Sequence, residues 1–180
     1  MADLKGTKTE ANLHAAFAGE SMASIKYTYF AARAKKDGYQ QIAGIFEETA
    51  GNEREHAKIW FKLLHGGDIP PTAENLLAAA EGEHEEWTKM YKRMAQEATE
   101  ENLEDIAKLF KMVAAIEKDH EERYRKLLEN LKSNSIFQKT EKITWICRNC
   151  GYLLNTKTAP KLCPVCTHPQ AFFEQRSVNY

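Results

Sequence analysis

The sequence predicts a mostly α protein, in which a four-helix bundle is followed by a small metal-binding domain. Four long segments repeat apolar residues in steps of three and four, and short turns separate them. Helices of this length with short connectors favour an antiparallel bundle. All four cysteines lie within residues 147–166, which indicates a local metal site more than a disulfide framework. We expect the bundle in residues 1–136 and the metal-binding domain in residues 142–180.

Charge and hydropathy argue against several classes of partner. The formal net charge is −1, so a nucleic-acid-binding surface is not indicated. No apolar run approaches the roughly 18 residues that a transmembrane helix needs. The opening stretch MADLKGTKTEANL lacks the apolar region that marks a secretory signal. We therefore expect a cytoplasmic location, with no nucleic-acid and no membrane partner.

Turn residues bound the first two predicted helices. Thr7 and Glu10 form a possible capping box where the first helix begins, and Asp37-Gly38 is a turn dipeptide where it ends. Gly66-Gly67 ends the second helix. The predicted helices run from about Thr7 to Lys36 and from about Tyr39 to His65.

Prolines and polar residues bound the other two helices. Pro70-Pro71 excludes helix before Thr72, which is expected to cap the third helix. Thr99 is expected to cap the fourth helix, which ends at Ser133-Asn134-Ser135. The predicted helices run from about Thr72 to Ala98 and from about Glu101 to Lys132, and a linker follows around residues 133–141.

Every predicted helix carries a carboxylate near the middle of its core-facing stripe. Glu53 and His56 stand three residues apart on the stripe of the second helix, and Glu117 and His120 do so on the fourth. One such pair on a charged helix is usually a solvated surface pair, but here both pairs are in phase with the core. The complete set of candidate ligands is Glu20, Glu53, His56, Glu83, Glu86, Glu117 and His120.

Five carboxylates in a bundle core need charge compensation. Moving even one ion from water into protein costs several kcal/mol, and the four stripes hold no lysine or arginine. Two divalent cations would neutralise most of the charge. Carboxylate oxygens with one imidazole per metal suit iron or manganese, whereas a site of thiolates suits zinc. A glutamate from each of two helices, with Glu-x-x-His from each of the other two, is the arrangement of dimetal carboxylate bundles.

Other polar residues of the helices have weaker assignments. Tyr27 and Tyr91 are either ordinary core tyrosines or donors of a hydrogen bond to a ligand carboxylate. The remaining histidines lack partners at ligand spacing and are expected on the surface: His14, His65, His84 and His168.

The cysteines form two knuckles of the kind that bind one tetrahedral metal. Twelve residues separate the two Cys-x-x-Cys pairs, which are Cys147 with Cys150 and Cys163 with Cys166. Residues 142–180 are too few to build an adequate core alone, so the metal is expected to fold this segment. The spacing is compatible with structural zinc or with a one-electron iron site, and Gly151 and Pro164 favour iron. The expected apolar core is Trp145, Tyr152 and Phe172.

Over essentially its whole length the chain resembles the rubrerythrin family. The match is carried by AFAGES around Glu20, by the two Glu-x-x-His motifs and by EGEHEEW with Glu83 and Glu86. CRNCGY and LCPVCTHPQAFFE match the family's rubredoxin-like tail. Ferritin-type sites have a single glutamate on the third helix and lack the thiolate module. One departure is Thr167, where the common rubredoxin knuckle has glycine.

The resemblance implies a ferritin-like di-iron bundle with a rubredoxin-like Fe(Cys)4 domain. It implies a non-haem di-iron peroxidase that reduces hydrogen peroxide to water in oxidative-stress defence. Electrons would come from a reduced pyridine nucleotide through a separate donor, a rubredoxin or a flavoprotein reductase. Glu53 and Glu117 would bridge two irons, with Glu20, Glu83 and His120 as terminal ligands and Glu86 and His56 as alternates. The thiolate iron would pass electrons to the di-iron site, and zinc is a possible substitute in that position.

The short connector between the second and third predicted helices predicts an oligomer. In a ferritin-like bundle the second and third helices run parallel, so their connector must cross about 34 Å at ~1.5 Å per residue. Residues 66–71 stretch over only about 20 Å. A homodimer in which helices are exchanged between chains would solve this. The alternative is a simple hairpin between the second and third helices.

Two other functions remain open from the sequence. A ferroxidase or iron-handling protein would oxidise Fe(II) with dioxygen in the same bundle, although it needs neither Glu86 nor a thiolate iron. A non-enzymatic adapter with a zinc ribbon would leave the five buried carboxylates unexplained.

Overall fold

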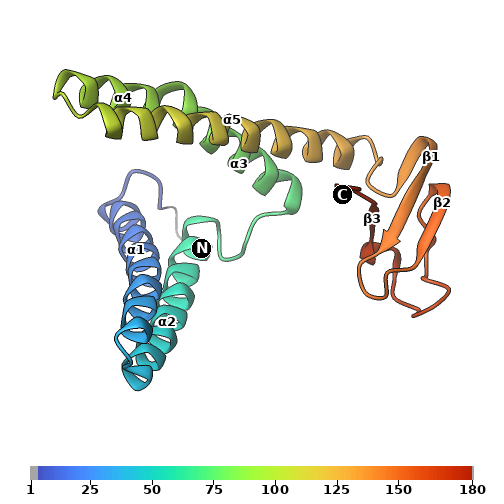
Figure 1. Ribbon diagram of the computed structural model, residues 1–180, viewed down its shortest axis with the longest axis horizontal. Coiled ribbons are helices and arrows are strands. Elements are labelled where there is room, and N and C mark those ends of the chain that lie inside the picture. Colours follow the sequence, from blue (N-terminus) through green and yellow to red (C-terminus); the bar gives the residue numbers. More distant parts are fainter. Residues whose placement is uncertain (1–3, 180) are drawn as a thin grey trace. The chain divides into compact units, whose positions relative to one another are not determined.

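The protein is mostly α-helical, with a small three-stranded domain after the helices (Figure 1). A computed structural model describes residues 4–179. The chain divides into two compact units, Met1–Pro70 and Pro71–Tyr180. The predicted class is confirmed. The elements are α1 (Lys8–Lys36), α2 (Gln40–Leu64), α3 (Thr72–Glu85), the π-helical turn η1 (Glu86–Met90), α4 (Tyr91–Glu100), α5 (Glu104–Lys132), β1 (Gln138–Cys147), β2 (Leu153–Thr158), the 3₁₀ turn η2 (Gln170–Phe172) and β3 (Phe173–Gln175).

The first unit is an antiparallel hairpin of α1 and α2 (Figure 1). The Thr7 hydroxyl caps α1 by accepting a 3.0 Å hydrogen bond from the Glu10 backbone N–H, as the sequence predicts. Gly38 has a φ of 86°, which the turn between the helices requires and which glycine adopts without strain. The Ser24 hydroxyl joins the helices by donating to the Ala50 carbonyl at 2.8 Å.

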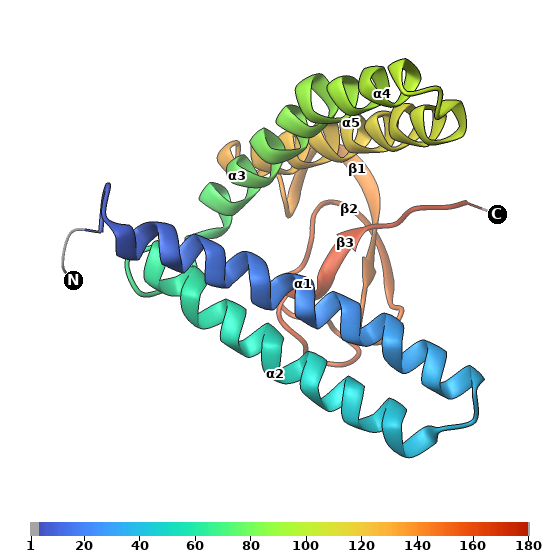
Figure 2. The ribbon, with the colours of Figure 1, turned by 90° about the vertical axis from the view of Figure 1, so that its left-hand side faces the viewer.

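The helices of the second unit form another hairpin (Figure 2), in which α3, η1 and α4 pack as one long segment along α5. The expected third helix is therefore present, but it is not a continuous α-helix. The Tyr91 backbone N–H bonds to the Glu86 carbonyl, an i to i+5 bond that defines a π-turn. The π-turn begins at one of the candidate ligands, Glu86.

Both predicted caps in this unit are wrong. Thr72 is the first residue of α3, and Pro71 occupies the capping position. Thr99 lies inside α4, which continues to Glu100, and Leu103 precedes α5. The reason lies in the turn itself, where Asn102 adopts a φ of 62° and the Leu103 N–H bonds to the Ala98 carbonyl. This bond closes the C-terminus of α4, and no side-chain hydrogen bond caps the start of α5.

Alanine dominates the fully buried positions of the helices. In the helices of the described chain, the buried apolar residues are alanines apart from Leu128, so the backbones of each hairpin approach closely. Many of the larger apolar side chains stay exposed. They are Met22, Ile25, Tyr29, Phe30, Ile42, Ile45 and Ile59 in the first unit, and Leu77, Leu103, Ile106, Leu109, Met112, Ile116 and Leu127 in the second.

The three strands form an antiparallel sheet in the order β2-β1-β3. Trp145 of β1 pairs with Leu154 of β2 and with Gln175 of β3, and its side chain is fully buried. The Trp145 indole N–H donates to the Thr156 carbonyl at 3.0 Å. β1 begins at Gln138, inside the segment that the sequence suggested as a linker.

The core of this domain differs from the prediction at one position. Trp145 and Tyr152 contribute to it as expected, but Phe173 is buried in place of Phe172, which is exposed and contacts His168 edge-on. Phe173 begins β3 and pairs with Cys147, which directs its ring inward. Among residues 4–179, no helix is long and apolar enough to cross a membrane.

Candidate metal centres

The first carboxylate cluster comprises Glu20 of α1 and Glu53 and His56 of α2. One potential ligand atom of each lies within 4.8 Å of the others. His56 Nδ1 is 2.8 Å from Glu53 Oε2. Their spacing of three residues on one helix puts both on the same face, as the sequence predicts. The imidazole of His56 is about half exposed, at 52%, whereas Glu53 is largely covered at 18%.

The second carboxylate cluster comprises Glu83 of α3 and Glu117 and His120 of α5. Its ligand atoms also lie within 4.8 Å of one another. His120 Nδ1 is 2.8 Å from Glu117 Oε2 and 3.7 Å from Glu83 Oε1. The two clusters therefore have the same composition, two carboxylates and one imidazole.

Electrostatics at the second cluster show how crowded its carboxylates are. Burial raises the pKa of Glu83, and the charge of Glu117 raises it further, against the opposing effect of His120. The charge of Glu86 and a hydrogen bond with Glu117 add to the increase. A cation between these groups would relieve this repulsion.

Two further predicted residues lie near the second cluster. Burial raises the pKa of Tyr91, and the charges of Glu86, Glu117 and Glu83 each raise it further. Tyr91 is therefore within electrostatic reach of all three carboxylates. Glu86, at the start of η1, is not part of the compact trio of the second cluster, although its charge acts on both Glu83 and Tyr91.

Tyr27 lies in an aromatic group of the first unit. Its ring is 6.0 Å from that of Phe30 and 6.1 Å from that of Phe46, centroid to centroid. These contacts fit the interpretation of Tyr27 as a core tyrosine. The role of its hydroxyl as a donor to a ligand stays a prediction.

The donor atoms of both clusters fit hard or borderline divalent cations. Each cluster offers carboxylate oxygens and one imidazole nitrogen, the set that suits iron or manganese. Neither cluster includes a lysine or arginine that could supply the compensating charge. The residues present therefore fit one metal ion per cluster.

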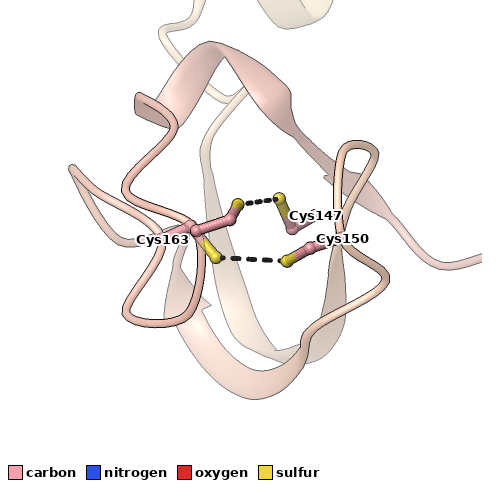
Figure 3. Close-up of side chains that lie close together, drawn as sticks. Cys147, Cys150 and Cys163 are labelled. Carbon is pink, nitrogen blue, oxygen red and sulfur yellow. Dashed lines mark hydrogen bonds between the residues drawn. The ribbon is translucent and has the colours of Figure 1, made fainter.

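The four cysteines converge from two knuckles (Figure 3). The Sγ atoms of Cys147 and Cys166 are 3.7 Å apart, and those of Cys150 and Cys163 are 3.6 Å apart. A tetrahedron with metal–sulfur bonds of about 2.3 Å has edges of about 3.8 Å. The spacing of the thiols therefore matches one tetrahedral metal ion.

The two knuckles have equivalent backbones. The Gly151 N–H donates to the Cys147 carbonyl at 2.8 Å, and the Thr167 N–H donates to the Cys163 carbonyl at 2.9 Å. The backbone N–H of His168 also bonds to the Cys166 thiol and is the main cause that lowers the pKa of this thiol. The bond from the Tyr152 N–H lowers the pKa of Cys150, but the contacts of Cys150 with the other thiols and its burial outweigh this bond, so its pKa is raised instead. Thr167 adopts a φ of 58°, so it takes the left-handed conformation of the glycine it replaces.

Sequence reasoning missed a buried carboxylate beside the second cluster. Glu121 is 7% exposed. Among residues 4–179 it is the only charged residue that is buried. It accepts hydrogen bonds from Trp87 Nε1 at 2.5 Å and from Arg125 Nε at 2.6 Å. His84 Nδ1 lies 3.0 Å from the same carboxylate, so the expected surface histidine is exposed but has a partner. Desolvation raises the pKa of Glu121, but the bonds from Trp87, Arg125 and His84 outweigh it and lower the pKa to about 2.

A signal for this network is present in the sequence. Ala107, Ala114, Glu121 and Leu128 follow one another at intervals of seven residues, and the first and the last two are buried. This repeat marks a second buried face of α5, next to the one that carries Glu117 and His120. A glutamate in such a repeat indicates a carboxylate with partners on the neighbouring helix.

Comparison with known proteins gives consistent matches over the whole chain. The family model for rubrerythrin matches residues 11–128, and that for the rubredoxin-like domain of rubrerythrin matches residues 145–174. A rubrerythrin of Porphyromonas gingivalis is 52% identical, over 98% of this chain and 94% of its own length. Rubrerythrin-1 of Clostridium acetobutylicum and a rubrerythrin of Nitratidesulfovibrio vulgaris are 49% and 47% identical, each over 100% of both chains.

Replacing Cys163, which is buried, by serine tests whether a metal folds the cysteine domain. We expect Cys163→Ser to lose the metal of this domain together with the buried environment of Trp145, because so small a segment cannot fold without it. Metal analysis and near-ultraviolet circular dichroism measure the two effects. The helical signal in the far ultraviolet is the internal control and should persist. Retention of the metal with an unchanged tryptophan signal would contradict the prediction.

Proposed function

The chain belongs to the rubrerythrin family, and from this premise we propose that it is a di-iron peroxidase that reduces hydrogen peroxide to water. The observation that carries the proposal is the presence, in one chain, of two matching carboxylate–imidazole clusters and a four-cysteine site. Two metal ions of a dinuclear centre need two such sets of ligands. The four-cysteine site adds a place for a one-electron metal.

The two clusters divide the ligands between two iron ions. Glu20 and His56 would serve one ion, and Glu83 and His120 the other. Glu53 and Glu117 would bridge them, which is possible because a carboxylate has two oxygens and each of these residues needs only one for its own cluster. When bound, the iron pair supplies the two electrons that, with two protons, convert hydrogen peroxide to two molecules of water.

Glu86 and His56 are the residues that we assign as alternates to one another. His56 is the more exposed member of the first cluster, and Glu86 lies outside the compact trio of the second. An anionic carboxylate favours a ferric ion, and a neutral imidazole tolerates a ferrous one. Two loosely held ligands of different charge therefore suit a centre that changes oxidation state.

Tyr91 is suited to hold a proton close to the carboxylates. Its raised pKa keeps the phenol protonated at neutral pH, so the hydroxyl can donate a hydrogen bond to an anionic oxygen. This group would orient a ligand carboxylate, or the peroxide itself, by donating to an oxygen. Tyr27 is assigned the corresponding role in the first cluster by analogy alone.

The four-cysteine site is assigned to a single iron that passes electrons to the di-iron centre. Cys150 is exposed, which gives an external donor short access to the thiolate site. The donor would be a rubredoxin or a flavoprotein reductase that draws on a reduced pyridine nucleotide. Zinc would fit the same four thiolates but would carry no electrons.

We assign the working form to a homodimer in which helices are exchanged between two chains. The exposed large apolar residues on both helical hairpins support this, because each hairpin alone covers only its alanine face. Residues 65–71, between α2 and α3, are also too few to run back along the length of a helix, as a bundle with parallel second and third helices in one chain would require. Each dinuclear centre would then combine the first cluster of one chain with the second cluster of the other.

Lengthening this connector tests the exchange. Inserting about 20 glycine and serine residues between Gly66 and Gly67 gives the chain enough length to complete a bundle alone. We expect the dimer to become a monomer that keeps its bundle metals, as measured by sedimentation equilibrium and metal analysis. If the unaltered chain is already a monomer at micromolar concentration with both bundle metals bound, helices are not exchanged.

Stopped-flow absorbance tests the peroxidase assignment. The fully reduced, iron-loaded protein is mixed without oxygen with hydrogen peroxide, and in parallel with dioxygen alone. We expect the ferric-thiolate colour to return rapidly with peroxide and much more slowly with dioxygen. Glu53→Ala should slow the peroxide reaction on the order of 100-fold, because it removes a ligand of the centre. Glu55→Gln, an exposed change two residues away, is the matched control.

Each contrary outcome points to one of the other functions. A faster reaction with dioxygen would indicate a ferroxidase, which the two carboxylate clusters alone would also suit. Absence of the colour despite iron in the bundle would indicate zinc in the cysteine site and a role as an adapter.

A further inference from the structure

Glu121 is a buried carboxylate that the proposed chemistry does not use. It lies one residue after His120, and its side chain is directed to α3 and η1 and not to the second cluster. Consecutive residues of a helix point about 100° apart, so a ligand and its successor occupy adjacent faces. Glu121 therefore belongs to the interface between α5 and the segment that holds Glu83 and Glu86.

Two partners of Glu121 also come directly after candidate ligands in the sequence. His84 follows Glu83, and Trp87 follows Glu86. Each contributes a hydrogen bond to the Glu121 carboxylate, at 3.0 Å from His84 Nδ1 and 2.5 Å from Trp87 Nε1. The carboxylate of Glu121, itself next to His120, thus joins the residues that follow two other candidate ligands.

The network lies across the start of the π-turn. His84 belongs to the last turn of α3, and Trp87 is the second residue of η1. The Glu121 carboxylate holds both, so it fixes the rotation of α3 and of η1 relative to α5. π-Turns are frequent at functional sites and widen the helix locally, so the direction of Glu86, the first residue of η1, depends on how this turn is held.

Stability alone gives a poor account of a carboxylate at this position. Leu128 fills the next position of the seven-residue repeat, which shows that an apolar side chain packs on this face. Burying a charge costs free energy of desolvation, and its ion-pair and hydrogen-bond partners do little more than offset that cost. Proteins in which apolar residues replace a buried ion pair are often equally stable or more stable. A directional group that accepts several hydrogen bonds at once sets geometry, which an apolar residue cannot do.

We propose that Glu121 is a positioning residue of the second carboxylate cluster. By accepting from both His84 and Trp87 it sets the rotation of α3 and η1 against α5, and so the placement of Glu83 and Glu86 relative to His120. Arg125 completes the arrangement by binding Glu121 at 2.6 Å and Glu81 at 3.1 Å. The inference rests on the proposed dimetal function of the cluster.

Cobalt(II) is the probe for this proposal, because its absorption reports ligand geometry. In the full-length chain, bands from carboxylate and imidazole sites are distinct from the intense sulfur-to-metal bands of the cysteine site. We compare the unaltered chain with Trp87→Phe, which keeps an aromatic ring and removes the N–H, and with Glu121→Gln, which removes the charge. Glu122→Gln, an exposed change at the next residue of α5, is the matched control.

The expected result is a change confined to the bundle. Both variants should bind one of the two bundle cobalt ions at least about 10-fold more weakly, with its absorption bands shifted. The cysteine-site bands and the behaviour of Glu122→Gln should match the unaltered chain. Thermal unfolding followed by circular dichroism reports stability separately. If Glu121→Gln does not fold, the same measurements on Trp87→Phe decide.

Two outcomes would overturn the inference, and they are distinguishable. If the variants bind bundle cobalt with unchanged affinity and spectrum, Glu121 has no positioning role, whatever happens to the unfolding temperature. If the unaltered chain itself binds no cobalt outside the cysteine site, the dimetal proposal fails and the positioning role fails with it.

Discussion

Compensation of carboxylate charge on the inner faces of the helices is the constraint on which the rest of this protein depends. Glu20, Glu53, Glu83 and Glu117 lie on stripes that supply imidazoles but no lysine or arginine. The raised pKa of Glu83 shows the consequence, since burial and the neighbouring Glu117 both disfavour its charged form. One cation at each cluster would relieve this repulsion, which is what the donor atoms of both clusters fit.

The same chain solves a similar problem in two ways. Where metal is expected, acidic groups face one another and are left for a cation to neutralise. Glu121, one residue after His120 on α5, is buried among side chains that donate hydrogen bonds to it. These bonds hold its pKa at about 2. A carboxylate held by several donors on two neighbouring segments is suited to fix how those segments are oriented. Adjacent faces of one helix therefore carry the metal ligands and the group that orients them.

The cysteine domain has thiols in its core. This core is small and includes two of the four thiols, Cys147 and Cys163, next to Trp145 and Phe173. The candidate ligands are thus part of the packing, so we expect metal binding and folding to be coupled. Equivalent backbone bonds in the two knuckles place all four sulfur atoms at tetrahedral spacing. The threonine at position 167 retains the conformation of the glycine knuckle in spite of its branched side chain.

Helical periodicity was sufficient to predict the Glu-x-x-His pair of each carboxylate cluster and the extent of most helices. A Glu-x-x-His pair needs only the helix to bring its members together, so Glu53 with His56 and Glu117 with His120 followed directly from spacing. The π-turn could not be predicted, because it depends on Trp87 and its bond across the interface and not on local preference. The prediction of Phe172 in the core, where the structure has Phe173, was wrong for a similar reason. Strand pairing of Phe173 with Cys147 decides which ring points inward.

Mössbauer spectroscopy of the reduced chain, loaded with three equivalents of iron-57, shows how many iron ions each kind of ligand set binds. We expect two classes of high-spin ferrous iron in a ratio of about two to one. The larger class should have the oxygen and nitrogen ligands of the carboxylate clusters, and the smaller should have four sulfur ligands. A spectrum with the sulfur-ligated class alone would contradict this expectation, because the carboxylates of the two clusters would then be compensated by something other than metal.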